Sequence, residues 1–225
     1  MTAPARLALF DLDGTLLVGD TDELWCEFLL DEGLLDPSFR ERNREVGAGY
    51  AAGTIPVEAY CGFYCALLAG RGEDWWPLRR RFVECVTSPR LAADAHACVE
   101  QHRSSGDRLV LTTATNRFLA EAVAEAFRFG AVIATELERS DDGTFTGRLS
   151  GTPNMRAGKV ERFRAWAAEQ GFDGDAALAD AVFYSDSAND LSLLLEVGRP
   201  VAVDPEPRLA AEAAARGWPV VSLRG

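Results

Sequence analysis

Hydrophobic positions follow two different patterns along the chain. Residues 17–88 carry apolar side chains at helical spacing, and capping and stop residues divide this part into four helices. From residue 91 onward, short apolar runs alternate with helical stretches, which is typical of a doubly wound sheet. An earlier apolar run, Leu7–Phe10, indicates a buried parallel strand. We therefore expect an α/β core that is interrupted, after its first strand, by a helical cap.

The same pattern predicts the elements of the core in order. The expected strands are Leu7–Phe10, Arg108–Thr112, Ala131–Thr135, Ala181–Tyr184, Pro200–Val203 and a short last strand at Val220 and Val221. The expected helices are one from Leu91 to Gly106, then Asn116–Phe127, Arg156–Gln170 and Pro207–Arg216. The run Asp141-Asp142-Gly143 predicts the turn of a hairpin between residues 136–139 and 144–148.

Together these elements predict an α/β fold with a doubly wound, Rossmann-like parallel sheet, an inserted helical cap and a small β-hairpin. Residues 1–16 and 89–225 are expected to form the α/β core, and residues 17–88 the cap. A chain of 225 residues, 48% of them hydrophobic, is long enough to bury a core of this size.

Charge and hydropathy narrow the partners and the compartment. Lys and Arg number 23 against 35 Asp and Glu, a net charge of -12, so no basic face is expected for nucleic acid or an anionic membrane. No apolar run approaches the length of a membrane span, and the first strand begins too early to leave room for a signal peptide. We expect a cytoplasmic protein, monomeric or homodimeric.

Candidate chemistry begins where the first strand ends, at Asp11 and Asp13. The carboxyl ends of parallel strands face the crevice in which ligands bind, and two neighbouring carboxylates favour a divalent cation. A calcium-binding loop is excluded because its sixth position is Leu16 and its twelfth is Asp22, where glycine and glutamate are required. On these residues alone, a solvated turn at the strand end remains an alternative.

Three further polar clusters follow at core strands or at the helices after them. Thr113-Ala114-Thr115-Asn116 follows the second strand, where a hydroxyl and free N–H groups at a helix start would suit a phosphate. Lys159 stands at the head of the helix after the hairpin. Ser185-Asp186-Ser187-Ala188-Asn189-Asp190 ends the fourth strand. Taken singly, each also has an ordinary structural explanation as a capping residue, a solvated lysine or an Asx turn.

In this order, D-L-D-G-T, a strand-end threonine, a lysine and S-D-x-x-N-D resemble the haloacid dehalogenase superfamily of phosphatases. The cap after the first strand and the hairpin before the lysine resemble its phosphoserine-phosphatase-like branch. The resemblance implies a Mg²⁺-dependent phosphomonoesterase with Asp11 as nucleophile and Asp13 as general acid and base. It implies Mg²⁺ ligation by Asp11, the Asp13 carbonyl, Asp186 and Asp190, and phosphoryl contacts from Thr113, the Ala114 N–H, Lys159 and Asn189.

The resemblance also bears on the substrate. Phosphoserine phosphatases hold the amine of their substrate with a cap glutamate and the carboxylate of the substrate with a cap arginine. Asp20 matches the position of the glutamate, and Tyr64 matches the position of the arginine. Without that guanidinium, an amino-bearing phosphomonoester lacking a carboxylate is favoured, and histidinol phosphate fits. The alternative for Asp20 is that it only caps its helix.

Other functions remain as alternatives. A phosphoserine phosphatase and a phosphosugar phosphatase or mutase share both aspartates, and a non-catalytic regulator would bind a phosphorylated metabolite without turnover. A dehalogenase has no need of Asp13 as an acid, so the intact D-x-D disfavours it.

Overall fold

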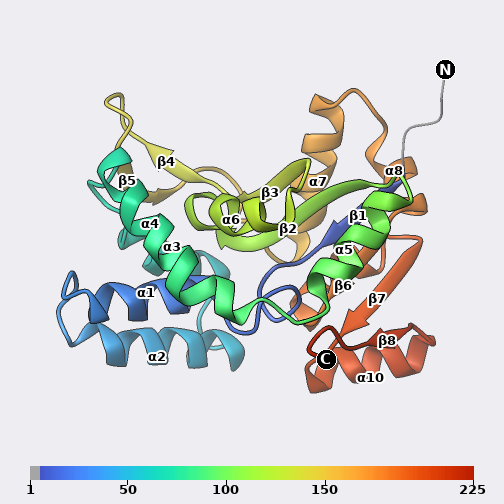
Figure 1. Cartoon of the computed structure of the whole chain (residues 1–225), viewed down its shortest axis with the longest axis horizontal. Coiled ribbons are helices and arrows are strands. Elements are labelled where there is room, and N and C mark those ends of the chain that lie inside the picture. Colours follow the sequence, from blue (N-terminus) through green and yellow to red (C-terminus); the bar gives the residue numbers. More distant parts are fainter. Residues whose placement is uncertain (1–5) are drawn as a thin grey trace.

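Six parallel strands form the central sheet of the computed structural model, which describes residues 6–225 (Figure 1). Residues 1–5, which the expected core includes, lie outside the described residues. The strands lie in the order β3-β2-β1-β6-β7-β8. Their bounds are Leu7–Phe10 (β1), Arg108–Asn116 (β2), Ala131–Thr135 (β3), Val182–Ser185 (β6), Arg199–Val203 (β7) and Val220–Val221 (β8).

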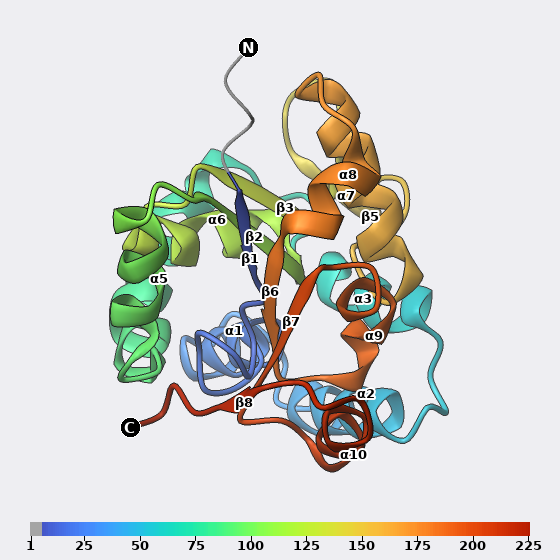
Figure 2. The ribbon, with the colours of Figure 1, turned by 90° about the vertical axis from the view of Figure 1, so that its right-hand side faces the viewer.

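Helices cover both faces of this sheet, as Figure 2 shows. One face packs against α5 (Ala95–Ser104), α6 (Arg117–Ala124) and the short η4 (Glu125–Phe127). The other packs against α7 (Ala157–Glu169), α8 (Gly174–Asp180), α9 (Leu191–Leu194) and α10 (Pro207–Arg216). Successive residues of β1 point to opposite faces: Leu7 and Leu9 toward α7, Ala8 and Phe10 toward α5. The strand is therefore buried on both faces, as its uninterrupted apolar run predicts.

The cap consists of helices that follow β1 along the chain. They are α1 (Thr21–Asp31), α2 (Phe39–Ala51), α3 (Val57–Ala66), η1 (Glu73–Trp75), α4 (Trp76–Phe82), η2 (Val83–Thr87) and η3 (Ser88–Arg90). Aromatic side chains fill its interior, with the Trp25 and Phe82 rings 5.1 Å apart. Backbone hydrogen bonds from Val18 to Arg90 (2.8 Å) and from Ala92 to Leu16 (2.9 Å) join the two chain segments that lead into and out of these helices.

A separate antiparallel hairpin, β4 (Leu137–Arg139) and β5 (Phe145–Leu149), contacts the cap. The Phe145 N–H donates to the Arg71 carbonyl (2.7 Å), and the Gly70 N–H donates to the Phe145 carbonyl (2.8 Å). Gly147, at φ +83°, allows close approach to the end of α3 and the turn after it, since a Cβ there would lie 2.7 Å from that of Ala69 and 3.4 Å from the Cα of Ala66. The hairpin thus fixes the cap against the core.

The predicted fold class is confirmed, with local differences. Strand β2 continues to Asn116, beyond its predicted end at Thr112, so Thr113–Asn116 are extended. Helix α6 begins at Arg117 with Asn116 as its N-cap, within one residue of the predicted start. The pairing of β2 with β3 shifts register between Thr112 and Asn116, which keeps this stretch extended but irregular. Helices α8 and α9 have no counterpart among the expected elements. Within residues 6–225, no helix has the length and apolar character needed to span a membrane.

Candidate active site

The site is organised around Asp11, the residue that follows β1. Its N–H donates to the Tyr184 carbonyl of β6 (2.9 Å), which extends the strand pairing by one residue and directs the buried side chain into the crevice. The chain then turns at Gly14, at φ +75°, where a Cβ would lie 2.0 Å from an oxygen of Asp186. Only glycine allows the first strand end to approach that of β6 so closely.

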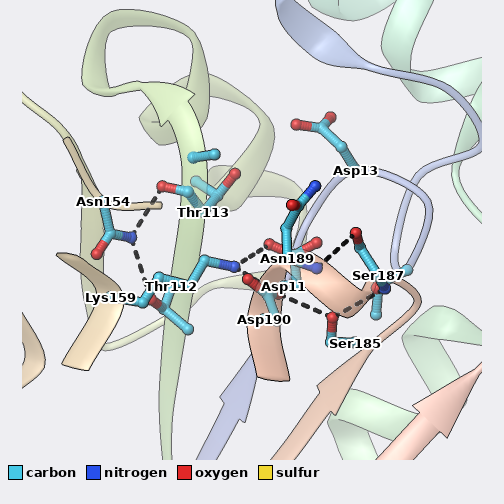
Figure 3. A network of polar contacts seen from close by, with 12 residues as sticks. Asp11, Asp13, Thr112, Thr113, Asn154, Lys159, Ser185, Ser187, Asn189 and Asp190 are labelled. Atoms are coloured by element: carbon cyan, nitrogen blue, oxygen red, sulfur yellow. Dashed lines mark hydrogen bonds and ion pairs between the residues drawn. The ribbon is translucent and has the colours of Figure 1, made fainter. Parts of the chain in front are cut away.

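Lys159, the single lysine of the sequence, lies in the middle of this crevice and is 1% exposed. Its Nζ donates to Asp11 Oδ1 (2.8 Å) and to Asp190 Oδ2 (2.6 Å), as Figure 3 shows. The Ser185 hydroxyl also donates to Asp190 Oδ2 (2.8 Å). Burial alone lowers the pKa of Lys159, but the two adjacent carboxylates outweigh it and raise the pKa above its usual value, so the ammonium stays charged.

The carboxylates here outnumber this one ammonium. Burial raises the pKa of Asp11, and Asp190 and Asp186 raise it further, against the effect of Lys159. Burial and Asp190 likewise raise the pKa of Asp186 to about 7. Additional positive charge at this point would therefore favour the ionised carboxylates.

Asp13 is held apart from this cluster, toward the cap (Figure 3). It accepts hydrogen bonds from the Thr21 N–H (2.8 Å) and from the hydroxyls of Thr21 and Thr115. Burial and the nearby Asp20 raise its pKa. A carboxyl that retains its proton more readily than usual suits the role of a general acid.

Thr113, Ala114 and Asn189, the other expected phosphate ligands, line the same cleft together with Asp186 and Asp190. The fully buried Asn154 supports this wall, because its Nδ2 donates to the Thr113 carbonyl (2.9 Å) and to the Thr112 hydroxyl (3.1 Å). The structure thus brings together the carboxylates, the lysine and the threonine that the sequence places far apart.

Asp20 lines the cleft from the cap side and also caps α1. Its Oδ1 accepts from the Glu23 N–H (3.0 Å) and its Oδ2 from the Tyr60 hydroxyl (2.8 Å). The two interpretations of Asp20, as a helix cap or as a cleft residue, are therefore compatible, because carboxylate oxygens accept more than one hydrogen bond each.

Tyr64 requires a correction. Its side chain is 1% exposed and lies in the cap interior, where its hydroxyl donates to Asn43 Oδ1 (3.0 Å). It is not among the residues that line the cleft. Tyr60, one turn earlier on α3, takes the place facing the cleft, and its ring packs edge-to-face on Tyr64 at 5.0 Å.

Sequence reasoning missed several residues that line this cleft of about 320 Å³: Asp22, Tyr50, Tyr60, Thr115 and Met155. For two of them a local signal exists. Asp22 lies in the same helical turn as Asp20, and Thr115 lies two residues beyond Thr113 on an extended strand, hence on the same side. Tyr50 and Tyr60 depend on how α2 and α3 pack, and Met155 on the path of the segment before α7, none of which a local pattern encodes.

The cleft also fits a small divalent cation of the magnesium type. Within residues 6–225, no three His, Cys, Asp or Glu side chains form a ready-made metal cluster. Mg²⁺, however, is usually held by one or two carboxylates with water completing its shell. Asp11 and Asp186 line the same cleft from neighbouring strand ends and offer carboxylate oxygens, so they meet that requirement.

Comparisons with known proteins agree with this geometry. Residues 8–195 match the family model of haloacid dehalogenase-like hydrolases. The chain is 36% identical to a histidinol-phosphatase of Neisseria meningitidis, over 97% of this chain and 99% of that protein. It is 28% identical to a phosphoserine phosphatase of Mycobacterium tuberculosis, over 96% and 70% of the two chains.

Solved structures show the same fold. A Bordetella pertussis protein of unknown function superimposes with a TM-score of 0.91 at 40% identity, covering 98% of this chain and 100% of that chain. A substrate-bound phosphoserine phosphatase superimposes with a TM-score of 0.69 at 19% identity, covering 99% and 94%.

Proposed function

Since the chain belongs to the haloacid dehalogenase-like hydrolases, we propose that it hydrolyses a small phosphomonoester through an aspartyl-phosphate formed on Asp11. The observation that carries this proposal is the buried contact of Lys159 with Asp11, at 2.8 Å, with Asp13 held separately on the cap side. Asp11 thereby lies beside a permanent positive charge, whereas Asp13 has a raised pKa and holds its proton more tightly.

In the proposed reaction, an Asp11 oxygen attacks phosphorus as the bond to the leaving oxygen breaks. Asp13 donates its proton to that oxygen, then removes a proton from the water that cleaves the aspartyl-phosphate. Lys159, the Thr113 hydroxyl, the Ala114 N–H and the Asn189 amide hold the phosphoryl oxygens. The ammonium matters because a phosphate dianion and a carboxylate nucleophile repel each other.

Mg²⁺ is the cofactor that we propose, held by the Asp11 carboxylate, the Asp13 backbone carbonyl and Asp186. Asp190, whose Oδ2 already accepts from Lys159 and Ser185, lies in or just outside this shell. When bound, the cation supplies the positive charge that the carboxylates of the cleft lack.

For the substrate, we propose an amino-bearing phosphomonoester without a carboxylate, with histidinol phosphate foremost. The likeness to the Neisseria histidinol-phosphatase and the position of Asp20 both support this choice. Phosphoserine, the substrate named for the mycobacterial relative, is less favoured because no arginine lines the cleft in the described part of the chain. We further propose that residues 17–88 act as the cap that closes over this group.

A turnover assay tests the proposal. The purified protein with Mg²⁺ should hydrolyse p-nitrophenyl phosphate and release inorganic phosphate from histidinol phosphate. Prior treatment with EDTA should abolish both activities, and added Mg²⁺ should restore them. Full activity after complete metal removal contradicts the cofactor, and no hydrolysis of any phosphomonoester contradicts the function.

A further inference from the structure

Asp22 is a buried carboxylate in the cleft for which the proposed reaction has no use. It lies in the first turn of α1 and is 6% exposed. Its Oδ1 accepts a hydrogen bond from Asn116 Nδ2 (2.6 Å), the residue that caps α6. Like Asp20, it lines the cleft from the cap side.

No cation of the chain compensates this charge in the described residues. Burial raises the pKa of Asp22, and Asp20 raises it further, opposed only by the hydrogen bonds from Asn116. Asp13 is similarly affected by Asp20. The cap side of the cleft therefore holds three carboxylates at close range, whereas Lys159 contacts only the core side.

Such an arrangement costs folding free energy, because a buried carboxylate needs a partner charge or several donors. If Asp22 served only to link α1 to Asn116, its negative charge would not be needed, because an asparagine at position 22 would accept the same hydrogen bond. A cationic or N–H-rich group from the substrate is the partner that this chemistry favours.

Aromatic rings beside Asp22 define the shape of that partner. The rings of Tyr50 and Tyr60 lie 4.3 Å apart at 35°, and the Tyr50 hydroxyl contacts the Met155 sulfur at 3.0 Å. The Tyr60 hydroxyl donates to Asp20 Oδ2 (2.8 Å), and Tyr60, Asp20 and Asp22 line the same cleft. Burial, and then Asp20 and Asp22, raise the pKa of Tyr60. Flat, polarisable walls next to carboxylates suit a planar basic heterocycle better than an aliphatic ammonium alone.

We propose that Asp22 accepts a hydrogen bond from a ring N–H of a planar, basic nitrogen heterocycle on the leaving group, while Asp20 binds its ammonium group. This inference rests on the proposed phosphomonoesterase function and deepens it. Two carboxylates at the start of α1 thereby recognise two different nitrogen groups of one substrate, and the packed rings of Tyr50 and Tyr60 form an aromatic wall beside the heterocycle.

Four phosphomonoesters separate these contributions: histidinol phosphate carries both groups, imidazolyl-ethyl phosphate only the ring, phosphoethanolamine only the ammonium, and p-nitrophenyl phosphate neither. Asp22→Asn removes the charge and retains an acceptor for Asn116. It should lower kcat/KM for the two imidazole compounds by about tenfold more than for the two compounds that lack this ring. Glu23→Gln, in the same helical turn but outside the cleft, is the matched control and should leave all four values within about twofold.

A fall of equal size on all four compounds, or no extra fall on the imidazole compounds, overturns the inference. An equal fall with a lowered melting temperature would assign Asp22 to the tether between α1 and Asn116. If the wild-type protein hydrolyses phosphoethanolamine but neither imidazole compound, the inference fails while the phosphomonoesterase stands. If it hydrolyses none of the four with Mg²⁺ present, the proposed function itself fails.

Discussion

The two sides of the cleft balance their charge in different ways. On the core side, a side chain of the protein compensates the negative charge, because the buried Lys159 donates to Asp11 and Asp190 at 2.8 and 2.6 Å. On the cap side, Asp13, Asp20 and Asp22 accept hydrogen bonds only from neutral groups: threonine, tyrosine, asparagine and backbone N–H. In the proposed function, the core side binds the group that all substrates share, the phosphate, and the cap side binds a cationic group that differs between substrates.

The largest effect is expected from the core side. Asp11→Asn removes the nucleophile, so kcat should fall by about 10⁴-fold or more for every phosphomonoester, whatever its leaving group. Quenched reactions with radiolabelled substrate should trap no phospho-enzyme. A kcat close to wild type in this variant would mean that another residue attacks phosphorus.

Lys159→Met tests the charge balance of the core side through stability. The change leaves Asp11 and Asp190 buried without their ammonium, so the free energy of unfolding should fall by about 3–5 kcal/mol. Adding Asp190→Asn should recover part of the loss, because one uncompensated charge is then removed. Arg164→Gln, which breaks an exposed ion pair with Asp175, is the control and should change stability by less than about 1 kcal/mol. Equal losses in both single variants would argue against a buried charge cluster.

The core side is also the part that the sequence predicts well, and the reason is local. Asp11, Asp186 and Asp190 follow buried apolar strands, and parallel strands bring their carboxyl ends to one edge of the sheet. Strand pattern and motif order are thus sufficient to place them. Lys159 is found from the motif order, since it lies in the first turn of the helix that comes after the hairpin.

The cap side could not be predicted to the same extent, because it depends on the rotation of packed helices. Counting along α3 led to Tyr64, yet the residue facing the cleft is Tyr60, one turn away. In the sequence, Asp22 is notable only because it occupies the position where a calcium-binding loop requires glutamate. Its burial follows from the contact with Asn116, which lies 94 positions further along the chain. No local sequence pattern indicates such a contact.

Asp20→Asn tests the cap side by substrate charge. Asparagine caps helices about as well as aspartate, so the helix is retained while the negative charge is lost. We expect kcat/KM for histidinol phosphate to fall by roughly tenfold or more, with a much smaller change for p-nitrophenyl phosphate. Asp20→Ala removes the cap as well and should additionally lower the melting temperature. Equal losses on both substrates in Asp20→Asn would leave Asp20 with a structural role alone.

The smallest expected effect concerns Glu23, outside the cleft. Burial, and then Asp20 and Glu27, raise its pKa from 4.5 to about 7. The folded protein therefore binds this proton more tightly than the unfolded chain, and the resulting stability is present below pH 4.5 and is lost as pH rises to about 7. Because the side chain is partly exposed, we expect a difference of about 1 kcal/mol between these limits. Glu23→Gln should flatten this part of the stability curve relative to wild type. Glu27→Gln removes only the last of these causes and should flatten it less. Parallel curves for all three proteins would contradict the assignment.

In the proposed function, the core side binds the phosphate and the cap side selects the rest of the substrate. The substrate preference of the unmodified protein tests this most directly. The measurement is kcat/KM for histidinol phosphate and for phosphoserine, at saturating Mg²⁺ and the same pH. The phosphate and the ammonium are common to both compounds, so the ratio reports only what the cap side does with the remaining group. A ratio of about ten or more in favour of histidinol phosphate is predicted, because carboxylates and aromatic rings, and no arginine among residues 6–225, line that side. A ratio of one or below would contradict the account and would point instead to the exposed Arg156, which contacts Asn189 and Tyr50, as a partner for the serine carboxylate.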